Sequence, residues 1–480
     1  MYKKYKKHVT LFALGITLTG ELIAQTTKVI EQHGIVWNFT EQVEYGKFAN
    51  GDYWVKGPVT LTSIDPKWDG LTNGWEINPR HRQEQAFIKK NGQAFVYEDS
   101  LRPKLPFTVN SGSIVKIIGG ENIGNSEVKV AGVLTVLEEI PENRGEIFFR
   151  PPYIGDNKPL ININKIRYDL LPTYLLPSTK LSLDQVRDKF SECLHMTHHK
   201  GNSRFFRPQL AMYAYQPRNT IDINEAILRL MGNESIDEKS QAMIHFTQFA
   251  LDVAYIVKDG FRRRDNGHSP NWRLVSAWAA VLLDLEEVKN ILSTSYDFHE
   301  DYYLYRNKEG IVLWGEASTE DQYWHRIMGL GGSRSRKDPY EFIDGGVQTT
   351  RGARYQEITS QSLKGQALIY HIFPNLKSCI PADTLAKLTD YTKRWVHLGT
   401  WTSPDPVAKF DGIIDNYRLT YGSNGKGGYI IGEGRYKKIH NSSPDGGQYK
   451  SNFVADMWNT YFSSVEDNLI PVGPTTLKVE

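Results

Sequence analysis

Residues 170–177 read LLPTYLLP, and this stretch divides the chain into two unlike parts. Two prolines in a short apolar run are typical of a connection, because proline interrupts both helices and strands. Before the stretch, short β-branched runs alternate with Gly, Asn and Pro, and after it apolar residues recur at helical spacing. The sequence therefore predicts an α+β multidomain protein, with a β-rich domain at residues 26–170 and a helical domain at residues 171–480.

The β-rich part combines short β-branched runs with residues that favour turns. The runs that predict strands are residues 53–55, 59–64, 114–118, 128–140, 148–149 and 160–163. Short strands of this kind predict a sandwich, or a sheet attached to the helical domain.

The helical part begins near Ser182, a suitable N-cap for a helix that carries Val186, Phe190 and Cys193. Further helices are expected at residues 237–257, 272–292, 320–328, 362–372 and 383–397. Many helices joined by long, polar, Gly-rich loops indicate an (α/α) barrel or toroid. Its functional site is expected on the loops of one rim.

The first residues have the layout of a secretory signal peptide. Four lysines among residues 3–7 precede a mostly apolar stretch at residues 9–20, and Ala24 offers a small residue before Gln25. The apolar stretch is shorter than the roughly 20 residues that cross a bilayer. We therefore expect residues 1–25 to be removed and the mature chain to be secreted or periplasmic, without a membrane span.

Charge and cysteine content exclude several classes of protein. Residues 1–25 hold four lysines and one glutamate, so their removal changes the formal net charge from +2 to −1. A nearly neutral chain is not expected to bind nucleic acid, and an acidic ligand would need a local cluster of basic residues. Two cysteines, Cys193 and Cys379, exclude multi-cysteine zinc motifs and leave a disulfide between them open.

Residues 265–273 (DNGHSPNWR) form a dense polar segment just before an expected helix. A histidine in such a loop, His268, can exchange protons near neutral pH. The alternative is structural: Asn271 or Ser269 caps the helix, and His268 is a solvated loop residue.

Residues 316–326 (EASTEDQYWHR) bring Tyr323 and Arg326 to one helix face, three residues apart. A nearby arginine lowers the pKa of a tyrosine, which suits a phenolate base. The alternative is an ordinary amphipathic helix whose aromatic side chains lie in the core.

Two further groups have candidate ligand chemistry. Arg351 and Arg354 lie in a Gly-rich segment, where they either grip carboxylates bidentately or are surface charges. His195 and His199 are four residues apart, a spacing that allows a shared metal ion. No glutamate lies between them and no third ligand is evident nearby, so neither a metal site nor a cofactor is expected.

Motifs at residues 266–268, 320–324, 354–356 and 394–395 are similar to a known family. They resemble alginate-lyase-like proteins of polysaccharide lyase family 38, which also contains glucuronan lyases, over roughly residues 180–400. The resemblance implies an (α/α) barrel, an acidic polysaccharide substrate and catalytic roles for Tyr323, His268, Arg326 and Gln209. It also implies substrate contacts from Asn266, Asn271, Arg273, Trp324, His325, Arg354 and Tyr355.

Such lyases cleave by β-elimination at a uronate. One group neutralises the sugar carboxylate, a base removes the C5 proton, and an acid protonates the departing oxygen. Tyr323 and His268 match the family's acid and base. Residues 207–209 read RPQ where the family has an Asn before a Gln, so either Gln209 or Arg207 would neutralise the carboxylate. The matching arginine is open among Arg326, Arg273 and Arg354.

Two other functions remain open from the sequence. A glycoside hydrolase needs two carboxylates about 5–9.5 Å apart, and its candidates are Asp265, Glu316, Asp321 and Asp344. A non-catalytic glycan-binding protein would use some of the 11 Trp and 26 Tyr residues for stacking on sugars. Convergence of Tyr323 and His268 on one pocket would favour an enzyme.

Overall fold

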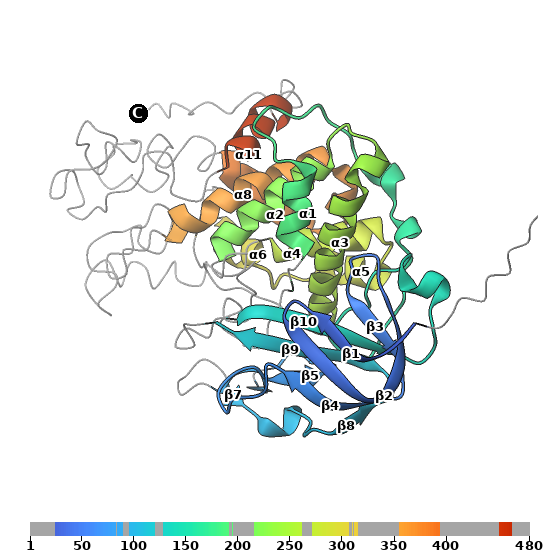
Figure 1. Cartoon of the computed structure of the whole chain (residues 1–480). Coiled ribbons are helices and arrows are strands. Elements are labelled where there is room, and N and C mark those ends of the chain that lie inside the picture. The colour runs from blue at the N-terminus through green and yellow to red at the C-terminus, as the bar shows by residue number, and fades with distance from the viewer. Residues whose placement is uncertain are drawn as a thin grey trace, which may run out of the picture.

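The computed structural model has strands first and helices after them (Figure 1). It describes residues 25–82, 84–89, 96–120, 128–191, 194, 216–261, 271–306, 310, 312–314, 355–393 and 451–462. The main sheet is built from residues 26–137, and the first α-helix begins at Leu183. The α+β class is therefore confirmed.

One curled, mixed sheet holds most of the strands. They are β1 (Thr26–Gln32), β2 (Ile35–Lys47), β3 (Tyr53–Lys56), β4 (Val59–Asp65), β5 (Trp75–Ile77), β8 (Phe107–Val109), β9 (Gly112–Gly119) and β10 (Val128–Leu137). The strand order is β5-β9-β10-β3-β2-β4-β8, with β1 paired to β2. The β10–β3 pair is parallel and the other pairs of this sheet are antiparallel. A short parallel pair, β6 (Glu84–Gln85) and β7 (Val96–Tyr97), lies apart from it.

The long strand β2 lets the sheet curl. Its first half pairs with β1 and β4, and its last three residues pair with β3. The inside of the curl is an apolar core that includes Trp37, Leu61 and Leu134. A Cβ on Gly132 would lie 2.8 Å from Ile35 Cδ1, so a larger residue there would require the end of the Ile35 side chain to move.

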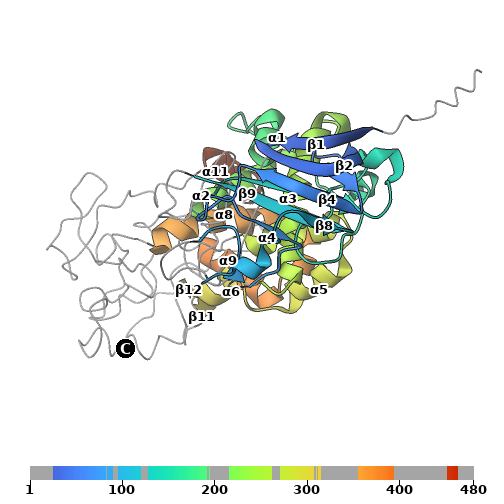
Figure 2. The ribbon, with the colours of Figure 1, turned by 60° about the horizontal axis from the view of Figure 1, so that its bottom comes forward.

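The outer face of β9 and β10 packs against the helices. Val115, Ile117 and Val133 belong to the same buried cluster as the residues of the central helices, whereas Leu134 faces the inside of the curl. Successive side chains of a strand point to opposite faces, so β10 is buried on both sides. This explains why residues 128–137 are almost continuously apolar. Figure 2 shows β2, β4 and β8 on the side of the sheet away from the helices.

The helical part surrounds one long buried helix, α3. The helices are α1 (Leu183–Ser191), α2 (Gln216–Leu230), α3 (Ile236–Lys258), α4 (Trp272–Leu282), α5 (Glu286–Thr294), α6 (His299–Tyr303), α8 (Tyr355–Ile372), α9 (Ala382–Tyr391) and α11 (Asn452–Met457). A small hairpin, β11 (Leu304–Arg306) and β12 (Val312–Trp314), follows α6. Every residue of α4 is buried. Among the helices that the structure describes, none has both the length and the apolarity needed to cross a bilayer.

Two helix starts follow the local rules for capping. The Ser182 hydroxyl accepts a hydrogen bond from Gln185 N at 3.0 Å, and the Gln185 side chain accepts one from Ser182 N at 2.8 Å. Ser235 and Glu238 form the same reciprocal pair at the start of α3. The predicted cap at Ser182 is therefore confirmed.

Several predicted elements differ from the structure. Residues 272–292 form two helices rather than one, because α4 ends at Leu282 and Asp284 takes a left-handed conformation (φ 57°) before α5. Phe148 and Asn162 form an isolated bridge, not the two predicted strands. Helix α2, whose first turn contains Pro217, was not among the predicted helices. The predicted helix at residues 320–328 lies outside the described residues.

Candidate functional site

Most of the predicted site residues lie outside the residues that the structure describes. These are Gln209, Asn266, His268, Tyr323, Trp324, His325, Arg326 and Arg354. The same holds for the hydrolase candidates Asp265, Glu316, Asp321 and Asp344, and for His195, His199 and Cys193. The structure describes Asn271 and Arg273 in full, and the backbone of Tyr355, the first residue of α8. Their assigned roles stay predictions.

Asn271 occupies the N-cap position of α4, but its side chain does not cap that helix. The residue is left-handed, with φ 68°, and wholly buried. Its Nδ2 donates to the Thr220 carbonyl at 3.0 Å and to Asn224 Oδ1 at 2.6 Å. The side chain therefore ties the start of α4 to α2, a contact that spacing within its own segment did not predict.

Asn224 extends this connection to α8. Its Nδ2 donates to the Ser362 carbonyl at 2.8 Å. A Cβ on Gly365 would lie 2.4 Å from Asn224 Nδ2, so a glycine on α8 allows the two helices to approach closely. Three helices thus meet around the buried carboxamides of Asn224 and Asn271. Together with the buried Asn219, five residues before Asn224 on α2, we call these the amide centre.

The amide centre is incompletely hydrogen-bonded. Within the described part of the chain, neither side-chain atom of Asn219 has a partner, and Asn271 Oδ1 has none. Both residues are buried. A buried amide without its hydrogen bond costs about 1–3 kcal/mol. Such groups are rare in native proteins, and one that persists calls for a specific explanation.

The predicted site residues belong to segments that lead into this centre. Residues 201–215 precede α2, residues 262–270 precede α4, and residues 315–354 precede α8. At 1.5 Å per residue, the first residue of α2 lies about 6 Å along its axis from Thr220. By the same rule, the first residue of α8 lies about 10 Å from Ser362. The first residues of α2 and α8 therefore lie within about two turns of the contacts that join these helices to α4 and to each other.

Arg273 lies in a second buried polar group on the other side of α4's first turn. Its Nε is 3.0 Å from Glu300 Oε1 and its Nη2 is 2.5 Å from Asp301 Oδ2. Burial raises the pKa of Glu300 and of Asp301, and the Arg273 charge opposes both shifts. Its side chain is 0% exposed. These ion pairs give Arg273 a structural role.

A pocket of about 430 Å³ lies between α1 and α2. Asp188, Lys189, Asp222 and Glu225 supply its charged groups. Burial raises the pKa of Glu225, and a hydrogen bond from the Ser451 hydroxyl opposes this. Asp222 and Glu225 are three residues apart on α2 and so share a face. The sequence did not indicate this carboxylate pair, because α2 itself was not predicted.

A third buried polar group joins the sheet to the helices, and we call it the junction cluster (Asp52, Arg150 and Asp252). Arg150 Nε is 2.6 Å from Asp52 Oδ2, and its Nη2 pairs with Asp252 on α3. Its Nη1 donates to the Pro151 carbonyl at 2.9 Å. Burial alone would lower the pKa of Arg150, but Asp252 and Asp52 hold it above its usual value.

Neither metal-ligand geometry, nor the free cysteine, nor similarity to known proteins assigns a function to the described residues. Among the described residues, no group of three His, Cys, Asp or Glu side chains is arranged to hold a metal ion. Cys379 is a buried free thiol whose pKa burial raises to about 11. In comparisons with known proteins, no family model, no curated protein and no solved structure matches the chain.

Proposed function

We propose that the protein is an exported polysaccharide lyase that cleaves a uronate polysaccharide of the alginate or glucuronan type by β-elimination. In this proposal the helices, with the segments outside the described residues, complete an (α/α) barrel. The observation that carries it is the amide centre. It has buried, unpaired carboxamide groups at the place where the segments bearing the candidate acid, base and carboxylate-binding residues join the helices.

The electrostatics of the amide centre suit an anionic substrate. Helix N-termini have partial positive charge and unpaired N–H groups, so they favour nearby anions. The centre lies at the N-cap of α4 and within a few turns of the N-termini of α2 and α8. An unpaired carboxamide such as Asn219 supplies a donor held in place before the reaction. A donor of this kind contributes on the order of 3 kcal/mol when charge develops on a substrate oxygen.

The proposed chemical roles of the residues are those that the sequence motifs predict. His268 is three residues before Asn271, and three residues span at most about 11 Å. Tyr323 and His268 act as acid and base, and Gln209 or Arg207 neutralises the carboxylate. Arg326 is one candidate for the arginine that faces the carboxylate. Arg354 directly precedes α8 and adds a second candidate cation. Arg273 is the weakest of the three arginine candidates because Glu300 and Asp301 already engage it.

A glycoside hydrolase is the second candidate function, and the pocket between α1 and α2 is the observation that favours it. Glu225 has the raised pKa that a general acid needs, and Asp222 is a second carboxylate on the same helix face. In this alternative Glu225 would protonate the leaving oxygen and Asp222 would activate water or attack the sugar.

The two functions differ in their products. The mature chain would be incubated with alginate and with glucuronan while ultraviolet absorbance reports unsaturated uronate, which only elimination forms. We expect absorbance to rise on one polymer and the rate to fall by about 10²-fold or more in Tyr323→Phe and His268→Ala. Tyr296→Phe is the matched control, because Tyr296 is 60% exposed and lies between α5 and α6.

Other outcomes would contradict the lyase. New reducing ends without absorbance, lost in Glu225→Gln, would establish hydrolysis. Absence of cleavage on both polymers would leave a glycan-binding protein. Export has its own test: N-terminal sequencing of the protein released by a producing cell should begin near residue 25, and an intact Met1 would contradict it.

A further inference from the structure

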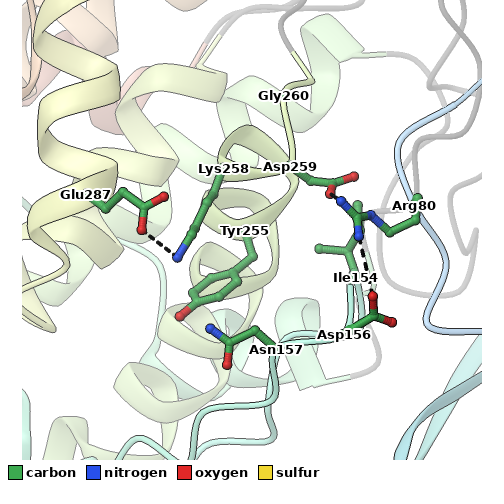
Figure 3. A pocket seen from close by; sticks show the side chains of 10 residues that line it. Arg80, Ile154, Asp156, Asn157, Tyr255, Lys258, Asp259, Gly260 and Glu287 are labelled. Carbon is green, nitrogen blue, oxygen red and sulfur yellow. Dashed lines mark ion pairs between the residues drawn. The ribbon is translucent and has the colours of Figure 1, made fainter.

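A separate pocket lies where loops of the β-rich part meet the C-terminal end of α3 (Figure 3). Its volume is about 370 Å³ and it opens to solvent. The β-rich side contributes Arg80, Asp156 and Asn157, and the helices contribute Tyr255, Lys258, Asp259 and Glu287. None of these residues belongs to the amide centre.

The charged groups of this pocket are already paired with one another. Arg80 Nη2 is 2.6 Å from Asp259 Oδ1, and its Nη1 is 3.6 Å from Asp156 Oδ2. Lys258 Nζ is 2.7 Å from Glu287 Oε2. The other oxygen of Asp259 accepts a hydrogen bond from His81 N at 2.7 Å. The pocket therefore offers an anionic ligand no uncommitted cation.

The uncommitted groups are neutral. Within the described residues, no hydrogen bond involves the Tyr255 hydroxyl or the exposed Asn157 carboxamide. Figure 3 shows these two groups near each other, between the two ion pairs. Lys258 Nζ lies 5.3 Å from the centre of the Tyr255 ring and covers part of one face. The pocket thus combines an aromatic ring with two neutral donor groups, the Tyr255 hydroxyl and the Asn157 amide, and two neutral acceptors, the Tyr255 oxygen and Asn157 Oδ1.

An aromatic ring beside neutral hydrogen-bonding groups fits one class of ligand better than the others. A metal ion would need a cluster of three suitable ligands, which the described residues do not form. An apolar ligand would cover the Asn157 amide and the Tyr255 hydroxyl without offering them hydrogen bonds. A sugar ring has an apolar C–H face that packs on an aromatic ring, and hydroxyl groups that both donate and accept.

We propose that this pocket binds a neutral saccharide unit. The ring packs against Tyr255, and the hydroxyls bond to Asn157, to the outer edge of Arg80 and to the exposed carboxylates of Asp156 and Glu287. The volume is near the lower end of the range for ligand pockets, roughly 300–1,000 Å³. It therefore suits a short segment of sugar rather than a long chain. The inference goes beyond the proposed lyase and does not depend on it.

The test is calorimetric titration of the mature protein with cellotetraose, mannotetraose and xylotetraose, and with tetragalacturonate as the acidic comparison. We expect at least one neutral oligosaccharide to bind, with little dependence on salt. Tyr255→Ala should weaken binding by about tenfold, which corresponds to about 1.4 kcal/mol. Tyr255→Phe keeps the ring and Asn157→Ala keeps the backbone, and each should show a smaller loss. Tyr296→Ala and Asn164→Ala are the matched exposed controls and should bind as the wild type does.

Three results would overturn the inference. One is the absence of binding by all three neutral oligosaccharides at millimolar concentration. Another is neutral binding that survives in both Tyr255→Ala and Asn157→Ala. The third is binding of tetragalacturonate alone that weakens at high salt, because this would mean that the paired charges open to receive an anion. Binding retained in the inactive Tyr323→Phe would show that this pocket and the lyase site are independent.

Discussion

The junction cluster and the amide centre are both buried and polar, yet they differ in how fully their hydrogen bonds are made. Every guanidinium nitrogen of Arg150 has a partner, and the carboxylates of Asp52 and Asp252 are both engaged. In the amide centre, both polar side-chain atoms of Asn219 and the Oδ1 atom of Asn271 lack a partner among the described residues. A satisfied buried network fixes a structure, whereas an unsatisfied one lowers stability.

This difference assigns the two groups different tasks. Asp52 lies in the turn between β2 and β3, Arg150 follows the sheet, and Asp252 lies in the middle of α3, so the junction cluster holds the two parts of the protein together. In the amide centre, the described residues leave Asn219 and Asn271 Oδ1 without hydrogen bonds, which is an energetic cost. Proteins keep such costs mainly at functional sites.

The largest expected effect is at Arg150. Arg150→Met would leave two buried carboxylates without their cation, so we expect the free energy of unfolding to fall by about 3–5 kcal/mol. Urea denaturation followed by circular dichroism measures it.

Arg167→Met is the matched control for that change. Arg167 pairs with Asp169 at 2.7 Å, but its side chain is 45% exposed. An exposed ion pair is screened by solvent, so this variant should lose far less stability than Arg150→Met. Equal losses in the two variants would show that the junction cluster does not hold the sheet to the helices.

The second-largest expected effect is a loss of stability at acidic pH, through protonation of Asp52 in the junction cluster. Burial alone would raise the pKa of Asp52, but the hydrogen bond with His33 and the charge of Arg150 hold it well below 3.8. A carboxylate with a lowered folded pKa contributes stability that is complete above its unfolded pKa. That contribution is lost as pH falls from 3.8 through the folded pKa.

Asp52→Asn tests this pH dependence. The variant cannot titrate at this position, so its free energy of unfolding should lie below that of the wild type at neutral pH. The two curves should converge as pH falls below about 4. Urea denaturation at a series of pH values gives both curves, and parallel curves would contradict the lowered pKa.

The amide centre permits a comparison within α2. Asn224→Leu removes hydrogen bonds with Asn271 and Ser362 and should cost about 1–3 kcal/mol. Asn219→Leu removes a buried amide that has no partner and should stabilise the protein by about 1 kcal/mol. If the proposed function is right, the stabilised variant should also lose lyase activity. A loss of stability in both variants would mean that Asn219 is an ordinary structural residue.

The sequence predicted those features of the fold that depend on local patterns of residues. The runs of β3, β4, β9 and β10, the cap at Ser182 and the position of α3 all follow from spacing within a few residues. The break at Asp284 was missed because a left-handed aspartate has no reliable local signature. The amphipathic pattern of α2 was overlooked beside Pro217, although proline is tolerated in a first helical turn.

The candidate site shows the same limit. Arg150 finds its partners 98 and 102 positions away in the sequence, and no spacing rule connects them. In the structural alternative for residues 265–273, Asn271 or Ser269 caps the helix, but the Asn271 amide donates to residues about 50 positions earlier. The sequence identified residues with suitable chemistry. Which of them become buried and paired depends on how distant elements pack.

Gln248 resembles both the junction cluster and the amide centre, and its substitution should have the smallest effect on the free energy of unfolding. Its Nε2 donates to the Arg150 carbonyl at 3.1 Å, as in the junction cluster, while its Oε1 has no partner among the described residues, as in the amide centre. Gln248→Met keeps the length of the side chain, loses one hydrogen bond and removes one unpaired acceptor. Because each change is worth about 1 kcal/mol with opposite sign, the free energy of unfolding should stay within about 0.5 kcal/mol of the wild type. Urea denaturation of the two proteins side by side measures this difference. A loss near that of Arg150→Met would mean that Gln248 is a full member of the junction cluster, and that an unpaired atom is a poor guide to function in this protein.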